Sequence, residues 1–168
     1  MPASDEMTVS ARRYQRRIIG HGALVMVVAL FAGFGLMFAL LGEIAIWPVP
    51  WTADVQIPGT PRGWRAAHVG GLTNGVMMVA VALCLPLLAM TEGRQRWVCR
   101  AMIFTGWANT VFYLFGNLAP NRGLSGGDNA FGPGTAAGLI AYVPAAIATV
   151  VTISALAVVA MAALREPA

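Results

Sequence analysis

The sequence contains no lysine, and only 11% of its residues are charged. Soluble globular domains carry about 25% charged residues, so this composition cannot supply an ordinary water-facing surface. Hydrophobic residues make up 58% of the chain. These proportions indicate an integral membrane protein in contact with the lipid bilayer, and they leave no stretch for a separate soluble domain.

Cysteine and histidine are also scarce. The two cysteines, Cys84 and Cys99, fall in or beside apolar segments, so we interpret them as small buried hydrophobic residues and not as a disulfide framework. No second His, Cys or carboxylate stands at ligand spacing from His68, which argues against a zinc or di-iron centre. The net charge of +4 does not indicate a nucleic-acid partner, because the arginines lie beside apolar segments, where the positive-inside rule explains them.

Four apolar segments are each long enough to cross a bilayer, which takes roughly 20 residues. The tail Met1–Arg17 is polar, and Pro86 is expected to kink a span without ending it. Eight arginines lie at the end shared by the two termini and three at the other, so both termini are predicted to be cytoplasmic, in a bacterial inner membrane. We therefore predict one all-α transmembrane domain, a four-helix bundle with spans at about residues 18–41, 62–90, 97–118 and 135–164.

Glycines and polar loops shape the non-cytoplasmic half. Gly33 and Gly35 in the first span allow close helix approach. The loop Gly42–Gly59 is rich in Trp and Pro, and the loop at 119–134 is rich in Gly, Asn and Pro, which indicates backbone with positive φ. Asn121 and Arg122 are candidates to cap the third span or to hold an anionic group.

His68 lies in the stretch IPGTPRGWRAAHVGGLTNG, where a polar segment turns into an apolar helix. An ionisable side chain near membrane depth is a functional-site hypothesis, and an interfacial histidine bonded to water or a headgroup is the alternative. His21 is expected at the opposite membrane face, about 30 Å away, in a capping or interfacial role. The glycines that follow His68 would leave a groove for a flat, bulky group: Gly70, Gly71 and Gly75.

A polar stripe marks the third predicted span. Its members recur every four residues and so lie along one slowly turning helix face. Lipid cannot satisfy amides or a phenol, so this face is predicted to point into the bundle or a cavity, either as a site or as interhelical hydrogen bonds. The stripe consists of Thr105, Asn109, Tyr113 and Asn117.

An apolar bundle with a glycine groove and one usable histidine is compatible with a haem b site, because haem iron commonly takes a proximal histidine. With one histidine, the sixth iron position would be open or taken by substrate. That arrangement favours Lewis-acid or oxygen chemistry over electron transfer. Composition and spacing leave a membrane protein without cofactor open as well.

Five segments in the four-span layout resemble the styrene oxide isomerase family of small integral membrane enzymes: IPGTPRGWRAAH, TNGVMM, GWANTVFYLFGN, APNRGL and FGPG. The match runs in order from about Ile57 to Gly134, nearly half of the chain. The resemblance implies a homotrimeric isomerase with haem b between neighbouring subunits. Its ferric iron would act as Lewis acid and convert aryl epoxides, such as styrene oxide, to aryl acetaldehydes by a Meinwald rearrangement.

Carried over residue by residue, His68 matches the axial ligand of the iron in that family. Three residues match the polar groups around the substrate: Asn74, Asn109 and Tyr113. Possible partners for the haem propionates are Arg62, Arg65 and Arg122.

One position departs from the family pattern. An acidic residue can stand one helical turn before the third-span asparagine, where this sequence has Thr105, so rate or substrate range could differ. The alternative function is a haem b electron-transfer or sensor subunit, which a six-coordinate spectrum would favour.

Overall fold

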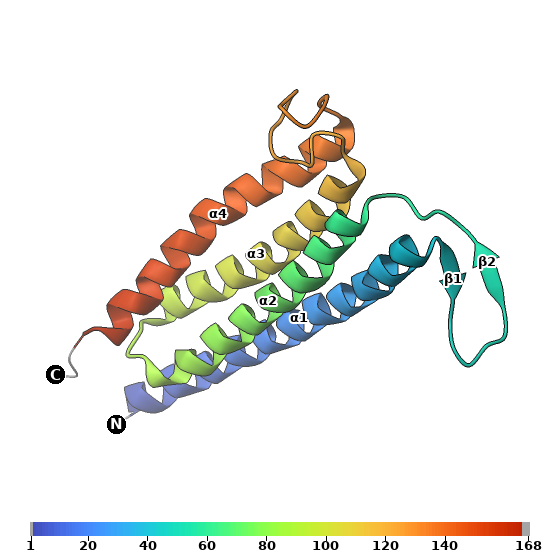
Figure 1. Cartoon of the computed structure of the whole chain (residues 1–168). Helices are drawn as coiled ribbons and strands as arrows, with labels where there is room; N and C mark the ends of the chain where they lie inside the picture. Colours follow the sequence, from blue (N-terminus) through green and yellow to red (C-terminus); the bar gives the residue numbers. More distant parts are fainter. Residues whose placement is uncertain (1, 166–168) are drawn as a thin grey trace.

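The computed structural model describes residues 2–165, and their side chains from residue 9 onward. These residues form four long helices and a small hairpin (Figure 1). The helical architecture confirms the predicted all-α class, except that the loop after the first helix contains two paired strands. In chain order the elements are α1 Pro2–Leu41, β1 Glu43–Ala45, β2 Thr52–Asp54, α2 Pro61–Cys84, the 3₁₀ turn Leu85–Leu87, α3 Glu92–Leu118 and α4 Ala136–Ala163.

Helix α1 begins at Pro2, well before the predicted span, so residues 2–17 of the predicted cytoplasmic tail are helical and continue the first span. No glycine or further proline interrupts this segment after Pro2. Its side chains also bond to α3: Ser10 Oγ donates to Gln95 Oε1 at 2.9 Å, and Tyr14 OH donates to Glu92 Oε1 at 3.0 Å. Contact with α3 therefore extends α1 beyond its apolar part.

The other helix ends follow local chemistry. Thr60 and Thr135 cap α2 and α4 by accepting from Gly63 N and Gly138 N at 3.1 and 3.2 Å, and such caps contribute about 1 kcal/mol each. Pro86 was expected to kink α2, but α2 ends at Cys84 and Pro86 lies in the 3₁₀ turn. Proline lacks the N–H that would continue the α-helical ladder.

Helices α1, α2 and α3 pack together, and α4 lies along α3 (Figure 1). The large buried side chains lie in the half of the molecule where α1 begins, among them Ile18, Met78, Leu85 and Met102. The opposite half, toward the loops, is packed through small residues such as Gly33, Ala67 and Gly70.

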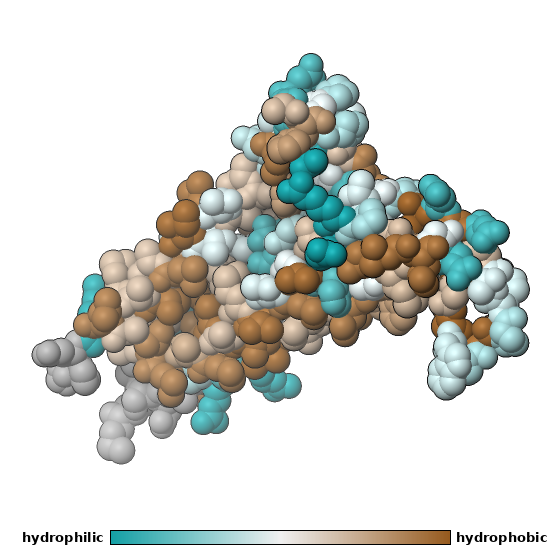
Figure 2. All heavy atoms as spheres, in the orientation of Figure 1, coloured by the Kyte–Doolittle hydropathy of each residue, from teal (hydrophilic) through white to brown (hydrophobic). Residues whose placement is uncertain are grey.

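Within the described residues, three helical segments are long and apolar enough to cross a membrane: Val9–Leu41, Pro61–Leu87 and Ala136–Ala163. Helix α3, predicted as the third of the four spans, is less apolar because it carries arginines and the polar stripe, but it lies beside all three other helices (Figure 1). Hydrophobic residues cover the flanks of the helices, and hydrophilic ones gather on the loops and hairpin (Figure 2). The exposed apolar side chains include Phe31, Val150 and Ile153, each more than 60% exposed. This surface is that of a membrane protein.

Candidate functional site

His68 projects from α2 onto the surface of α1. Its Nδ1 lies 2.9 Å from the carbonyl oxygen of Ala29. A carbonyl can only accept, so Nδ1 carries the proton and the lone pair of Nε2 is left for another partner. Gly33 makes this contact possible, because a Cβ there would lie 2.8 Å from Nδ1.

The depth of His68 differs from the prediction. Ala29 is at the middle of the predicted span 18–41, so the imidazole lies at mid-depth and not at the outer face. The reason is that α2 begins at Pro61, about two turns before His68. These first turns pack on the end of α1, where the Trp64 ring lies against Gly35. His21 precedes Ala29 by eight residues, about 12 Å along α1, so the predicted 30 Å between the histidines was wrong.

His21 has a structural role inside the bundle. Trp107 Nε1 donates to His21 Nδ1 at 3.1 Å, with the two rings edge to face. Because α1 begins at Pro2, His21 lies many turns inside the helix, so the expected capping role was wrong, and the interfacial position stays a prediction. The pair joins α1 to α3.

Three predicted site residues form one hydrogen-bonded chain between α2 and α3, which we call the polar trio: Asn109, Asn74 and Tyr113. Asn109 Nδ2 donates to Asn74 Oδ1 at 3.1 Å, and Asn74 Nδ2 donates to the Tyr113 hydroxyl oxygen at 3.5 Å. Asn74 is buried, and the Tyr113 ring lies against Gly70, where a Cβ would overlap it. Because Asn74 donates to the phenol oxygen, the phenolic proton is available to another acceptor.

The rest of the polar stripe serves packing. Thr105 Oγ1 lies 2.7 Å from Thr152 Oγ1 of α4. At the other end, Asn117 Oδ1 accepts from Thr60 N at 2.8 Å and so holds the start of α2. Each four-residue step turns the stripe by about 40°, which carries it from α4 round to α2. The predicted inward orientation of the stripe is confirmed. Its members have different roles, because Asn109 and Tyr113 belong to the polar trio, Asn117 holds the start of α2 and Thr105 contacts α4.

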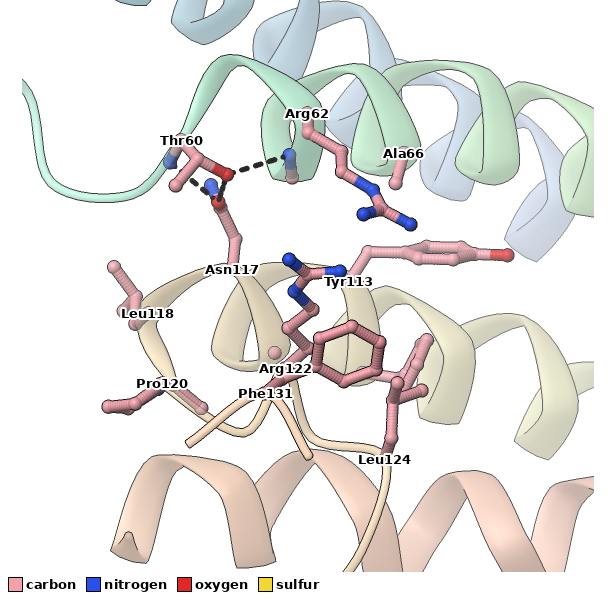
Figure 3. Close-up of a pocket in the computed structure, with 14 residues that line it drawn as sticks. Thr60, Arg62, Ala66, Tyr113, Asn117, Leu118, Pro120, Arg122, Leu124 and Phe131 are labelled. Atoms are coloured by element: carbon pink, nitrogen blue, oxygen red, sulfur yellow. Dashed lines mark hydrogen bonds between the residues drawn. The ribbon is translucent and has the colours of Figure 1, made fainter. Parts of the chain in front are cut away.

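A cavity of about 700 Å³ opens between α2, α3 and the loop that follows α3 (Figure 3). Arg62 and Arg122 project into it from opposite walls, beside the ring of Tyr113, whose hydroxyl points away from the loop (Figure 3). The Arg122 guanidinium stacks 3.9 Å from the centroid of the Phe131 ring. Other lining residues are mostly apolar, including Ala66, Phe112 and Leu124.

The loop wall of this cavity is organised by Asn121, a role that the sequence interpretation missed. Asn121 is fully buried, donates to the carbonyl oxygens of Ser125 and Gly127 at 3.2 and 2.9 Å, and accepts from Gly123 N at 3.0 Å. Arg122 and Gly123 have φ of 60° and 64°, as the Gly- and Asn-rich composition indicated. The Asn-Arg-Gly sequence was the available signal, since Asn side chains commonly bond to backbone two residues on.

The structure does not bring His68 and the polar trio onto one side of α2. Residues 68 and 70 point about 200° apart on a helix, so His68 faces α1 whereas Gly70 and the Tyr113 ring face α3. No hydrogen bond among the described residues joins His68 to the trio. Arg65 is exposed and lies one turn from His68, outside the large cavity.

These residues fit a haem held through one imidazole. Ligating histidines usually donate their other ring N–H to a carbonyl or carboxylate, which fixes the tautomer, and the contact between His68 and Ala29 has that form. The half-buried ring, and two arginines that have no carboxylate partner among the described side chains, Arg62 and Arg122, match the needs of an amphiphilic porphyrin with two carboxylates.

Comparison with known proteins gives an independent result. The model of the family described as styrene oxide isomerase matches residues 14–164. A curated relative, the styrene-oxide isomerase of Pseudomonas fluorescens, is 40% identical over 153 residues, covering 91% of this chain and 90% of the relative. The chain therefore belongs to the styrene oxide isomerase family and is an isomerase that acts on epoxides.

Proposed function

We propose that this protein converts aryl epoxides such as styrene oxide to aryl acetaldehydes by a Meinwald rearrangement, with ferric haem b as its cofactor. The observation that carries the proposal is the chain from Asn109 through Asn74 to Tyr113. It leaves one phenolic proton without an acceptor among the described residues, on a tyrosine that lines the cavity between α2 and α3. The substrate class follows the name of the relative.

His68 would hold the iron through Nε2, because its Nδ1 is engaged by Ala29. When bound, ferric haem b supplies a Lewis acid that weakens the benzylic C–O bond of the epoxide. Arg65, one turn from His68, and Arg122, with Arg62 beside it in the cavity, would bind the propionates by charge-assisted hydrogen bonds.

The polar trio acts on the epoxide oxygen. Negative charge builds on that oxygen as the ring opens, and the Tyr113 hydroxyl donates a hydrogen bond to it. Asn74 holds the phenol and Asn109 holds Asn74, so the donor is oriented before the reaction begins, which is the condition for strong electrostatic stabilisation.

The reaction needs nothing from water. The benzylic C–O bond breaks, a hydride moves from the carbon that keeps the oxygen to the benzylic carbon, and a C=O bond forms. Atoms and electrons balance without an added proton, reductant or oxidant. Apolar walls such as Phe112 and Ala66 exclude water, which would otherwise trap the benzylic cation as a diol.

We also propose a homotrimer with haem between neighbouring subunits. The divergent directions of His68 and Tyr113 on α2 support a site built from two copies. The exposed apolar face of α4 offers surface for lipid or for another copy. The end where α1 begins and α4 ends carries eight arginines, which supports its placement on the cytoplasmic side of a bacterial inner membrane.

The decisive experiment compares wild-type protein with His68→Ala in detergent. We expect the substitution to abolish both the haem absorbance band and the conversion of styrene oxide to phenylacetaldehyde. Aldehyde formation by haem-free protein would refute the mechanism. A six-coordinate iron with two protein ligands throughout turnover would instead favour the electron-transfer or sensor alternative.

A further inference from the structure

A second cavity, of about 540 Å³, lies between α1 and α3 at the end opposite the large loops. We call it the arginine cavity. Its walls carry two arginines from each helix, spaced four residues apart, so that each pair lies on one helix face. The arginines are Arg13 and Arg17 of α1 and Arg96 and Arg100 of α3.

Positive charge in this cavity exceeds the available negative charge. Glu92 Oε1 accepts from Arg13 Nη2 at 3.2 Å and from Arg96 Nη2 at 3.4 Å, so one carboxylate serves two guanidinium groups. Arg17 and Arg100 lie one turn deeper. Among the side chains that the structure describes, neither has a carboxylate within ion-pair distance. Two cations therefore face the cavity without a countercharge.

The depth of the arginine cavity matches the membrane interface. Arg17 directly precedes the uncharged segment that begins at Ile18, and the lining of the cavity extends to His21, which is bonded to Trp107. One turn further along α1, Leu24 is 53% exposed and continues the face of Arg17. A ligand with an anionic head at the arginines would therefore have an apolar surface below it for hydrocarbon chains.

We propose that the arginine cavity binds the phosphodiester headgroup of an anionic phospholipid. Guanidinium groups bind phosphate oxygens in bidentate pairs, and basic pockets between membrane helices bind lipid headgroups. The exposed apolar face beside the cavity favours a lipid over free phosphate. This binding site is separate from the proposed haem site, because none of its residues belongs to the polar trio or contacts His68.

The test uses the full chain with its haem, purified in detergent, and records the thermal unfolding midpoint during titration with phosphatidylglycerol. Binding to the folded state should raise the midpoint by about 5 °C at saturation. Phosphatidylcholine and inorganic phosphate at the same concentration should give no rise. An equal rise with inorganic phosphate would show a free-phosphate site and overturn the lipid assignment, as would an equal rise with phosphatidylcholine.

Matched variants assign the effect to the cavity. Arg17→Gln combined with Arg100→Gln should abolish the rise. Arg12→Gln combined with Arg16→Gln, which removes the same charge from outside the cavity, should retain it. Isomerase activity in lipid-free detergent should be unchanged in both. If the double variant fails to fold, the single variant Arg100→Gln is measured by native mass spectrometry. We expect it to retain tenfold less bound phosphatidylglycerol than the wild type. Retention of lipid by Arg100→Gln and by the double variant would overturn the proposal.

Discussion

The Nδ1 atom of His68 and the carbonyl oxygen of Ala29 lie 2.9 Å apart, so helix α1 selects the tautomer of an imidazole carried by helix α2. A carbonyl in this position fixes which ring nitrogen is free. Partners of this kind typically change metal affinity by about 10–100-fold when they are disturbed. The site therefore depends on the packing of two helices as well as on the ligand itself.

Gly33→Ala tests this dependence. The new Cβ would lie 2.8 Å from Nδ1, so the ring must move away from Ala29. We expect at least tenfold weaker haem retention, measured as the Soret absorbance after dialysis against apomyoglobin. Gly20→Ala is the matched control on the same helix, because a Cβ there meets nothing within 4 Å. Equal haem retention in the two variants would contradict the positioning role of Gly33.

Tyr113→Phe removes the proposed donor without removing the ring. We expect kcat for styrene oxide to fall about 100-fold, the usual effect of losing one preorganised donor, with haem content unchanged. Tyr142→Phe, on the exposed side of α4, should leave kcat within twofold. A normal kcat for Tyr113→Phe would remove this residue from the reaction and leave the polar trio as a packing contact.

Arg65→Gln and Arg122→Gln should each weaken haem retention by about tenfold, because a hydrogen bond to a charged group contributes roughly 1.5–3 kcal/mol. The measurement is the rate of haem transfer to apomyoglobin. Arg94→Gln, at the opposite end of the molecule, serves as control and should transfer haem at the wild-type rate. If Arg62→Gln alone accelerates transfer, the propionate assignments of Arg65 and Arg122 are wrong.

Thr105 should matter for stability more than for rate. Its hydroxyl lies 2.7 Å from that of Thr152, which directs it toward α4 and away from Asn74. A double-mutant cycle with Thr105→Val and Thr152→Val should give a coupling free energy of about 1 kcal/mol for unfolding in detergent. The kcat of Thr105→Val should stay within threefold of wild type. A larger loss of kcat would assign Thr105 to the site, in the place where the family can carry an acid.

Asn121→Ala should loosen the loop that follows α3. The substitution leaves the buried Gly123 N–H and the carbonyl group of Ser125 without the partner that Asn121 supplies, at a cost of about 1–3 kcal/mol for a buried unsatisfied group. The carbonyl group of Gly127 loses one of its two donors and keeps the Ser125 hydroxyl. Amide hydrogen exchange across residues 119–134 should rise at least tenfold. Thr149→Ala is the control, because it removes an exposed hydroxyl from α4, outside this loop. Amide protection of the loop in Asn121→Ala equal to that in Thr149→Ala would contradict the role of Asn121.

Much of the site was predictable from sequence because its residues are chemically conspicuous. Two amides and a phenol within apolar helices cannot face lipid, so the sequence predicted that the polar stripe of α3 faces inward, and it singled out His68 as a candidate ligand with an interfacial position as the alternative. The helix ends at Leu41, Thr60, Leu118 and Thr135 were likewise predictable within a few residues from glycine, proline and cap chemistry.

Other features, such as where helices begin and end, depend on contacts between segments far apart in the chain, and sequence periodicity does not predict which segments will be in contact. The segment 2–17 is helical and bonds to α3 through Ser10 and Tyr14. The α-helical part of α2 ends just before Pro86, which lies in a 3₁₀ turn and not at a kink within a continuous α-helix. The carbonyl of Ala29 carries no side-chain signal at all. Its role became visible only when α1 and α2 were placed side by side.

The amino-acid sequence by itself determined that this chain forms apolar helices with a small set of polar groups that must find partners inside, because lipid offers none. The tertiary structure alone decided which partner each group finds. In the folded chain His68 bonds to Ala29, Tyr113 bonds to Asn74, and Thr105 bonds to Thr152. The physical reason is that a hydrogen bond between helices depends on their relative depth and rotation, and these are set by where glycines let two backbones approach.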